Sequence, residues 1–365
     1  MRKGMKKAVS AVLVSVICLA GALPAAAGEV SATGTVAEID EFGNAVLDIT
    51  IDDFEADGFA LGDIVNVEAG PYTGDLPYFN GFYVKPGDYL INTNDGTGTI
   101  EVCINYGDIG EVENVRAGDP VVLTLKEKGG ALKIQEASDI VYTNDRGDYS
   151  SDEVFANFRP VIDGKLYRSS SPADNLIGRA AFADALAEEA GVRTIMDMAD
   201  TDEKIEGYFE QEDYDSPHFK ELYEDGKVIP LAMNINFFSD DFAEGIVEGC
   251  GFLAENEPPY LVHCREGKDR TGFACALLEA LMGWTEEEIE DDYMTTYTNF
   301  YGIEKGTEKY DTIVEINITE MLRFIAGAEE GDPLEEADLQ AAAETYLTSH
   351  GMSEESVKTL EEKLS

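Results

Sequence analysis

A cysteine and an arginine six positions apart lie in a segment whose residue types could bind an anion and attack it. Cys264 follows an apolar run, Gly267 lies midway, and Arg270 opens a helical pattern. A loop that closes on a helix N-terminus directs backbone N–H groups and the positive end of the helix dipole at one place. The same surroundings stabilise a thiolate, and the arginine adds a bidentate fork for phosphate oxygens. The segment therefore predicts a nucleophilic cysteine inside its own anion site.

The reaction expected of this loop is hydrolysis of a phosphate monoester through a phosphocysteine. Cys264 would attack phosphorus while Arg270 and the loop amides stabilise the equatorial oxygens, and water would then release phosphate. The Thr271 hydroxyl is placed to hydrogen-bond the sulfur when it leaves in the second step. This chemistry requires no metal and no cofactor. The predicted phosphate-binding residues are Arg265, Glu266, Gly267, Lys268, Asp269 and Arg270.

The segment resembles the protein-tyrosine-phosphatase superfamily, most closely the bacterial tyrosine and lipid phosphatases whose loop reads His-Cys-x-x-Gly-Lys-Asp-Arg-Thr-Gly. Residues 164–170 and 191–197 look like that group's first two strands, so the resemblance covers most of residues 155–325. It implies a tyrosine phosphatase with possible dual or phosphoinositide specificity, because Lys268 accompanies such breadth in relatives. A phytase-like inositol polyphosphate phosphatase and a mainly ligand-binding protein stay open as alternatives.

The acid that would protonate the leaving oxygen has several candidates. Asp269 lies inside the loop, and the resemblance implies a catalytic part for it. Asp240 and Asp241 lie upstream, where many members of the superfamily carry a mobile loop with an acid. Asp197 ends a predicted strand at the same edge of the sheet. For each of these aspartates taken alone, a solvated carboxylate is the simplest interpretation. As candidates for the acid, we rank Asp269 first, then Asp240 and Asp241, then Asp197.

The composition limits the partners. The chain has 26 Lys and Arg against 74 Asp and Glu, a net charge of −48. Nucleic acids and anionic membranes need a basic face, so the expected partner is a phosphorylated protein or a small phosphomonoester. The oligomeric state is left open. Cys103, Cys250 and Cys275 are too widely spaced to suggest a disulfide framework, and the histidines form no zinc-binding pattern.

The N-terminus has the pattern of a secretory signal. Basic residues precede an apolar run from Ala8 to Leu23, and small residues follow it. The run is shorter than the roughly 20 residues that a spanning helix needs. We therefore predict that residues 1–27 are a cleaved signal peptide, that no membrane span remains, and that the protein is secreted or extracytoplasmic.

Residues 28–141 have the pattern of an all-β barrel or sandwich. Short alternating apolar runs are separated by Gly, Asn and Asp, with a turn signal at 94–96. Runs are expected at 34–39, 62–67, 99–103 and 120–125. Parts of this region, from 34 to 122, look like the C-terminal β-barrel of S-adenosylmethionine hydroxide adenosyltransferases. That resemblance implies a fold and an accessory role, because the catalytic half of those enzymes has no counterpart here.

A polar, turn-rich stretch at 142–153 predicts a linker, and residues 154–365 predict a phosphatase domain. There, strands expected at 165–168, 192–197, 228–231 and 260–263 alternate with helices near 178–190 and 241–255. This alternation is typical of an α/β sheet flanked by helices. Further helix starts are expected at Thr285, which forms a capping box with Glu288, and at Asp332.

Overall fold

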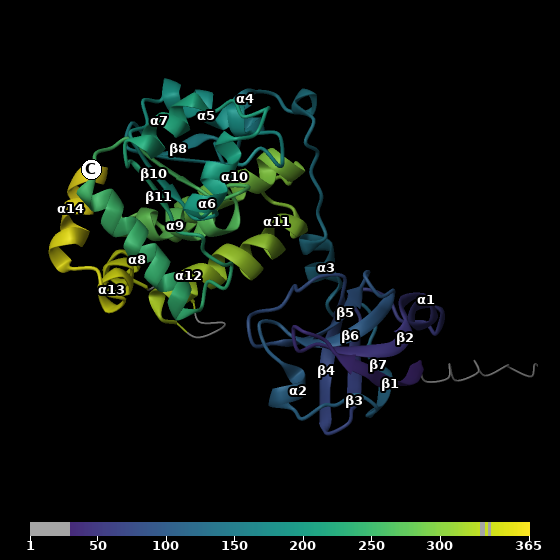
Figure 1. The fold of residues 1–365 in the computed structure, drawn as a ribbon. Coiled ribbons are helices and arrows are strands. Elements are labelled where there is room, and N and C mark those ends of the chain that lie inside the picture. Colours follow the sequence, from purple (N-terminus) through teal and green to yellow (C-terminus); the bar gives the residue numbers. More distant parts are fainter. Residues whose placement is uncertain (1–29, 329–332, 335–336) are drawn as a thin grey trace, which may run out of the picture.

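The computed structural model describes residues 30–328, 333–334 and 337–365, and these form a β-barrel followed by an α/β unit (Figure 1). The fold class expected from the sequence, an all-β domain before an α/β domain, is confirmed at this level. The predicted signal peptide at 1–27 and the helix start at Asp332 lie outside the described residues.

The barrel closes in the strand order β1-β2-β6-β5-β4-β3-β7. Its neighbours are antiparallel except for β4 and β5, and β1 pairs with β7 to close it. Alternate side chains such as Val65, Val67 and Leu123 are fully buried in its interior, as a half-buried strand requires. The strands are β1 Ser31–Ile39, β2 Ala45–Thr50, β3 Ile64–Ala69, β4 Tyr72–Phe79, β5 Tyr89–Asn94, β6 Thr99–Ile104 and β7 Pro120–Glu127. The helices of this half are α1 Ile51–Ala56, α2 Ile109–Val112 and α3 Leu132–Ser138.

The α/β unit is built on a sheet of order β11-β10-β12-β9-β8. The first four strands in that order are parallel, and β8 is an antiparallel edge strand. The register aligns Asp197, His263 and Ser169 at the carboxyl ends of three neighbouring strands. The strands are β8 Arg159–Ile162, β9 Leu166–Ser169, β10 Thr194–Asp197, β11 Val228–Pro230 and β12 Tyr260–His263.

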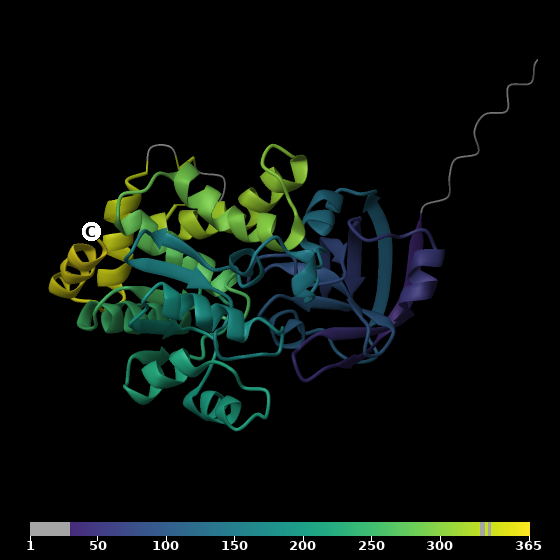
Figure 2. The same cartoon turned by 90° about the horizontal axis from the view of Figure 1, so that it is seen from above.

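Helices cover both faces of this sheet (Figures 1 and 2). Ile195 and Leu261 pack against α5, α6 and α7 on one face, whereas Met196 and Val262 pack against α8 and α9 on the other. The helices are α4 Asp152–Phe155, α5 Ala180–Glu189, α6 Asp202–Phe209, α7 Pro217–Glu224, α8 Asp240–Glu255, α9 Asp269–Leu281, α10 Glu286–Tyr301, α11 Glu308–Ile313, α12 Glu320–Ala326, α13 Leu339–Ser349 and α14 Glu354–Leu364. The 3₁₀ turn η1 spans Arg146–Asp148, and the π-helical turn η2 spans Val314–Thr319 between α11 and α12. The capping box expected at Thr285 begins α10.

Helix α3 joins the two halves. Ile134 packs with barrel residues such as Phe79, while Ala137 is buried in the core of the α/β unit. Ion pairs cross the same boundary, from Lys85 to Glu320 at 2.5 Å and from Lys133 to Glu308. The barrel is therefore docked on the α/β unit.

The stretch expected to be a linker at 142–153 is packed against the α/β unit. The guanidinium of Arg179, a fully buried residue, lies 4.9 Å from the ring centre of Tyr142 and 5.1 Å from that of Tyr149. Its Nη2 donates to the carbonyl of Thr143 at 3.0 Å. Cation–π contacts of this kind are stronger when desolvated, so the stretch is fixed in place.

Candidate active site

The loop from Cys264 to Asp269 joins strand β12 to helix α9 at the carboxyl edge of the sheet. Cys264 is 3% exposed and directly follows the buried strand. Gly267 has φ of 68°, and a Cβ there would meet the carbonyl oxygen of Ser169 at 2.2 Å. Only glycine permits both the left-handed backbone and this close approach to β9. The sequence places the glycine where the loop must turn against the sheet.

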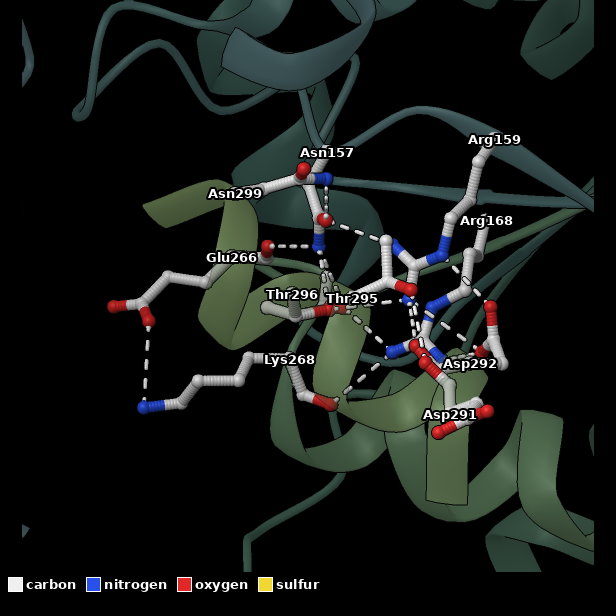
Figure 3. A network of polar contacts seen from close by, with 11 residues as sticks. Asn157, Arg159, Arg168, Glu266, Lys268, Asp291, Asp292, Thr295, Thr296 and Asn299 are labelled. Atoms are coloured by element: carbon white, nitrogen blue, oxygen red, sulfur yellow. Dashed lines mark hydrogen bonds and ion pairs between the residues drawn. The ribbon is translucent and has the colours of Figure 1, made fainter. Parts of the chain in front are cut away.

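The carbonyl groups of the loop are held outward by buried donors. Nη2 of Arg168 donates to the Gly267 carbonyl at 2.9 Å, and Nδ2 of Asn157 donates to it at 3.1 Å. The amide of Ser171 donates to the Arg265 carbonyl at 3.0 Å. Figure 3 shows Asn157 and Arg168 meeting this side of the loop. The outward carbonyls leave the opposite, inner side of the loop to its N–H groups.

The amides of residues 265–268 are the backbone donors of the loop. Among the described residues, none of these N–H groups donates a hydrogen bond to a protein acceptor. Because they precede the N-terminus of α9, the helix dipole adds to their positive potential. Successive free amides at a helix N-terminus form an anion site of the kind that the sequence predicts.

Arg270 is held at the mouth of the loop by two backbone carbonyls. Its Nη1 donates to the carbonyl of Met198 at 3.0 Å and to that of Met233 at 2.8 Å. These residues follow β10 and β11, so neighbouring strand ends fix the guanidinium. Both bonds use Nη1, and the N–H groups on Nε and Nη2 are the ones that can bind phosphate oxygens.

A buried ion cluster supports the loop from behind (Figure 3). Asp292 on α10 pairs with Nε of Arg159 at 2.7 Å and with Nη1 of Arg168 at 2.5 Å. Burial alone would raise the pKa of Asp292, but the two arginines outweigh it and lower the pKa to about 2. Arg168 also donates a hydrogen bond to the Gly267 carbonyl, so the cluster fixes the position of the loop backbone.

Thr271 is fully buried in the first turn of α9. Its Oγ1 has no hydrogen-bond partner among the described residues. An unpaired buried hydroxyl is costly, and a donor seven positions after Cys264, one turn into the following helix, is suited to bond a sulfur acceptor. The structure thus leaves Thr271 available for the role predicted from the sequence.

Lys268 and Glu266 turn their side chains to the flank of the loop. Nζ of Lys268 lies 3.7 Å from a carboxylate oxygen of Asp269 and 3.8 Å from one of Glu266. Burial disfavours the charged lysine, but these carboxylates and Tyr301 outweigh it and raise the pKa of Lys268. Glu266 also accepts a hydrogen bond from the Tyr142 hydroxyl at 3.0 Å. Two carboxylates therefore already balance the charge of Lys268.

The acid candidates lie in different surroundings. The side chain of Asp269 is 40% exposed at the first position of α9, beside the loop. Asp240 and Asp241 are exposed in the first turn of α8, where Ser239 is the N-cap. Acidic residues in a first turn stabilise the helix dipole, which accounts for both. Of these three, the structure brings Asp269 to the loop.

Asp197 is fully buried at the end of β10. Its Oδ1 accepts from the amides of Ala199 at 2.8 Å and Asp200 at 3.3 Å, while its Oδ2 has no partner among the described residues. Burial raises the pKa of Asp197 to about 7, against the opposing effect of those amides and of Arg270. Burial likewise lowers the pKa of the neighbouring His263 to about 4, so that this histidine is neutral at pH 7.

Two further aspartates near the loop were not predicted from the sequence. Asp174 accepts from Nε of Arg265 at 3.2 Å, and Asp200 accepts from the Tyr208 hydroxyl at 2.9 Å. Both follow the carboxyl ends of parallel strands, β9 and β10. The carboxyl ends of parallel strands meet at one edge of the sheet. The position of both aspartates after predicted strands could therefore have indicated that they lie near the loop.

The pH dependence of stability tests the environment of Asp197. An acid whose folded pKa is raised destabilises the folded state as pH rises from about 4 to about 7. Asp197→Asn retains an oxygen for both amides and does not ionise. Between pH 5 and pH 8, wild type is expected to lose about 2 kcal/mol more unfolding free energy than the variant, measured by urea denaturation. Parallel pH profiles would contradict the buried, titrating carboxyl.

Cys103, Cys250 and Cys275 are buried and free like Cys264, but they lie on a strand or helix and not in the loop. Burial raises the pKa of Cys250 to about 12 and also raises that of Cys103. Burial is likewise the largest cause that raises the pKa of Cys275 to about 12. Thiols of this kind are poor nucleophiles.

The part of the chain that the structure describes contains no group of three or more His, Cys, Asp or Glu side chains that could hold a metal ion. Its helices are all too short or too polar to cross a bilayer.

A family and two solved structures are similar to this chain. The model of the tyrosine phosphatase family matches residues 145–365, more than half of the chain. No curated protein matches the sequence. The chain is similar to an uncharacterized conserved protein from Thermotoga maritima, with 28% identity, 26% of this chain and 35% of that chain covered, and a TM-score of 0.24. It thus spans about a third of that protein's length.

The chain is also similar to the core catalytic domain of the PP-IP phosphatase SIW14 from S. cerevisiae in complex with citrate. The identity is 20%, the match covers 47% of this chain and 91% of that chain, and the TM-score is 0.27.

Proposed function

Because the chain belongs to the tyrosine phosphatase family, we propose that it hydrolyses phosphate monoesters through Cys264, with phosphotyrosine as the preferred substrate. The observation that carries this proposal is the arrangement of the loop. Its carbonyls are bonded outward to Arg168, Asn157 and Ser171, and its amides are left for an anion beside the cysteine. Arg270, fixed by two carbonyls, completes the site.

In the first step the sulfur of Cys264 attacks phosphorus, and the bond from phosphorus to the leaving oxygen breaks. The loop amides and Arg270 stabilise the equatorial oxygens, as preorganised donors do. Asp269 gives its proton to the leaving oxygen. In the second step water attacks phosphorus, its proton passes to Asp269, and the electron pair of the sulfur–phosphorus bond returns to Cys264. Thr271 donates a hydrogen bond to that sulfur.

The charges around the loop favour a substrate with one phosphate. In the reacting form Asp269 carries the proton that it donates, so Lys268 is balanced by Glu266, and Arg265 is paired with Asp174. The chain as a whole carries a charge of −48. An inositol polyphosphate needs several uncompensated cations for its further phosphates. Phosphotyrosine needs only the loop amides and Arg270, and it therefore fits this site better.

The place of action and the role of the barrel are also proposals. The signal pattern at 1–27 supports export, and export would make the substrates extracytoplasmic phosphoproteins or small phosphomonoesters. The resemblance of the barrel to that of S-adenosylmethionine hydroxide adenosyltransferases supports a non-catalytic origin for this half.

A substrate panel tests the proposed function. The mature protein, reduced and in the presence of EDTA, is assayed for phosphate release from a phosphotyrosine peptide, a phosphoserine peptide and inositol hexakisphosphate. We expect kcat/KM to be highest for phosphotyrosine, by about tenfold or more, since a good aryl leaving group and a single phosphate both suit the site. Hydrolysis only of inositol hexakisphosphate, or activity that EDTA abolishes, would refute the proposal.

The same panel tests Asp269. Asp269→Asn cannot donate a proton, so it should slow the phosphoserine peptide more than the phosphotyrosine peptide, because an alkoxide is the poorer leaving group. Asp240→Asn is the matched control and should leave both rates unchanged. An equal loss on both substrates in Asp269→Asn, or a selective loss in Asp240→Asn, would move the acid away from Asp269.

A further inference from the structure

Tyr106 stands out on the barrel by its backbone. It lies in the turn after β6, between Ile104 and Gly107, which form a β-bridge. Its φ is 57°, a left-handed conformation that bulky side chains rarely adopt, and its side chain is 56% exposed. A backbone of this kind persists only where surrounding structure enforces it, and such positions cluster at functional sites.

The turn is enforced by the neighbouring loop between β4 and β5. Asn105, a buried residue, donates from Nδ2 to the Val84 carbonyl at 2.7 Å. Its backbone amide donates to the Asp88 carbonyl at 2.9 Å, and its carbonyl accepts from the Gly87 amide at 2.7 Å. Three hydrogen bonds to one residue make the two loops a single rigid edge that presents Tyr106.

This edge of the barrel faces the active site. Lys85 and Pro86, in the loop that holds Asn105, line a hollow together with Phe238, which lies three residues after Ile235. Burial raises the pKa of Tyr106, while the Ile235 backbone and the charge of Arg270 act in the opposite direction. Ile235 lies two residues after Met233, whose carbonyl holds Arg270. Lys85 on the same edge forms the 2.5 Å ion pair with Glu320 on α12. These contacts place the barrel edge beside the segment after β11, whose Met233 carbonyl holds Arg270.

We propose that the barrel supplies one wall of the active site, and that Tyr106 packs against the aromatic ring that carries the phosphate. This inference rests on the proposed function. Ile235 and Leu176 are apolar and exposed, at 54% and 72%. Ile235 lies in the segment between Met233 and Phe238 that adjoins the barrel edge, and Leu176 follows Asp174, the partner of Arg265. An anion site rimmed by a tyrosine and aliphatic side chains suits a phosphorylated aromatic ring.

The test measures binding, so that it does not depend on turnover. Cys264→Ser and Cys264→Ser with Tyr106→Gly are titrated by calorimetry with a neutral phosphotyrosine peptide and with inorganic phosphate. Glycine removes the side chain and accepts the left-handed backbone, so the loop keeps its shape. We expect the Kd of the peptide to rise about tenfold, the scale of a lost ring contact, while the Kd of phosphate changes by less than about twofold.

The matched control is Val122→Ala in the Cys264→Ser background, which removes a partly exposed apolar side chain from β7 and should change neither Kd. Unchanged peptide affinity in Tyr106→Gly would overturn the proposal. Equal weakening of both ligands would also overturn it, because Tyr106 would then support Arg270 instead of the substrate. Peptide binding no tighter than phosphate binding in Cys264→Ser itself would exclude any aromatic wall. Failure of the proposed function is seen separately, as absence of hydrolysis in the wild type.

Discussion

Replacing Cys264 by serine is expected to lower kcat for p-nitrophenyl phosphate by about four orders of magnitude or more. The thiolate is the attacking species in the proposed reaction, and a serine hydroxyl is far less acidic than a thiol. The loop amides and Arg270 do not depend on this side chain for their bonds, so the variant should still bind inorganic phosphate. Rates are measured under reducing conditions with EDTA present.

The control for this substitution is Cys250→Ala. Cys250 is buried on α8, its pKa is raised by burial, and alanine leaves no unpaired polar group there. Mass spectrometry of acid-quenched wild type during turnover should show a phosphate adduct on the peptide that contains Cys264. A Cys264→Ser variant that retains a large part of the wild-type rate, or an adduct on another residue, would rule out the proposed nucleophile.

Asp292→Asn is expected to destabilise the protein by about 3 to 5 kcal/mol at pH 7. The substitution leaves Arg159 and Arg168 buried without their counter-charge, and an unpaired buried charge costs more than the pair contributes. Because the pKa of Asp292 is lowered to about 2, its stabilising contribution is fully present above about pH 4 and is lost as pH falls through 2. Urea denaturation measures the change.

Asp291 provides the matched control, since it is the adjacent residue on the same helix (Figure 3). Its partner Lys305 lies at 2.6 Å, but both side chains are about half exposed. Exposed ion pairs contribute little to stability, so Asp291→Asn should change the free energy of unfolding far less than Asp292→Asn does. Equal effects of the two substitutions would show that the buried cluster has no special role.

A second consequence of Asp292→Asn concerns the loop. Arg168 holds the Gly267 carbonyl outward, and its own orientation depends on Asp292. The variant should therefore show a lower kcat/KM than wild type at a temperature where both remain folded.

The sequence predicted the strand, loop and helix around Cys264 because the signals for them are local. The strand expected at 260–263 coincides with β12, and α9 begins within the predicted loop, at Asp269. The apolar run, the glycine and the helix pattern are contiguous, so no knowledge of distant residues was required. The strands expected at 192–197 and 228–231 were found as β10 and β11 with slightly shorter bounds.

Residues that act across the fold had no such signal. Asp292 meets Arg168 from 124 positions away, and nothing near either residue in the sequence indicates the other. The barrel strands β2, β4 and β5 were not predicted individually. In β4 the cause is the presence of Gly74 and Pro77, which usually interrupt a strand. The stretch 142–153 was interpreted by its polar composition, whereas its tyrosines decide its packing against Arg179.

Helix α3 sets a condition on how substrates reach Cys264. One of its side chains, Ile134, is embedded in the barrel, and another, Ala137, is embedded in the α/β unit. Swinging the barrel aside would pull one of these out of a packed interior, which is costly. The barrel edge that carries Tyr106 therefore stays in one position relative to the α/β unit instead of opening as a lid. Under the proposed function, we expect a phosphorylated residue on an extended segment to be hydrolysed faster than one on a rigid helix or sheet.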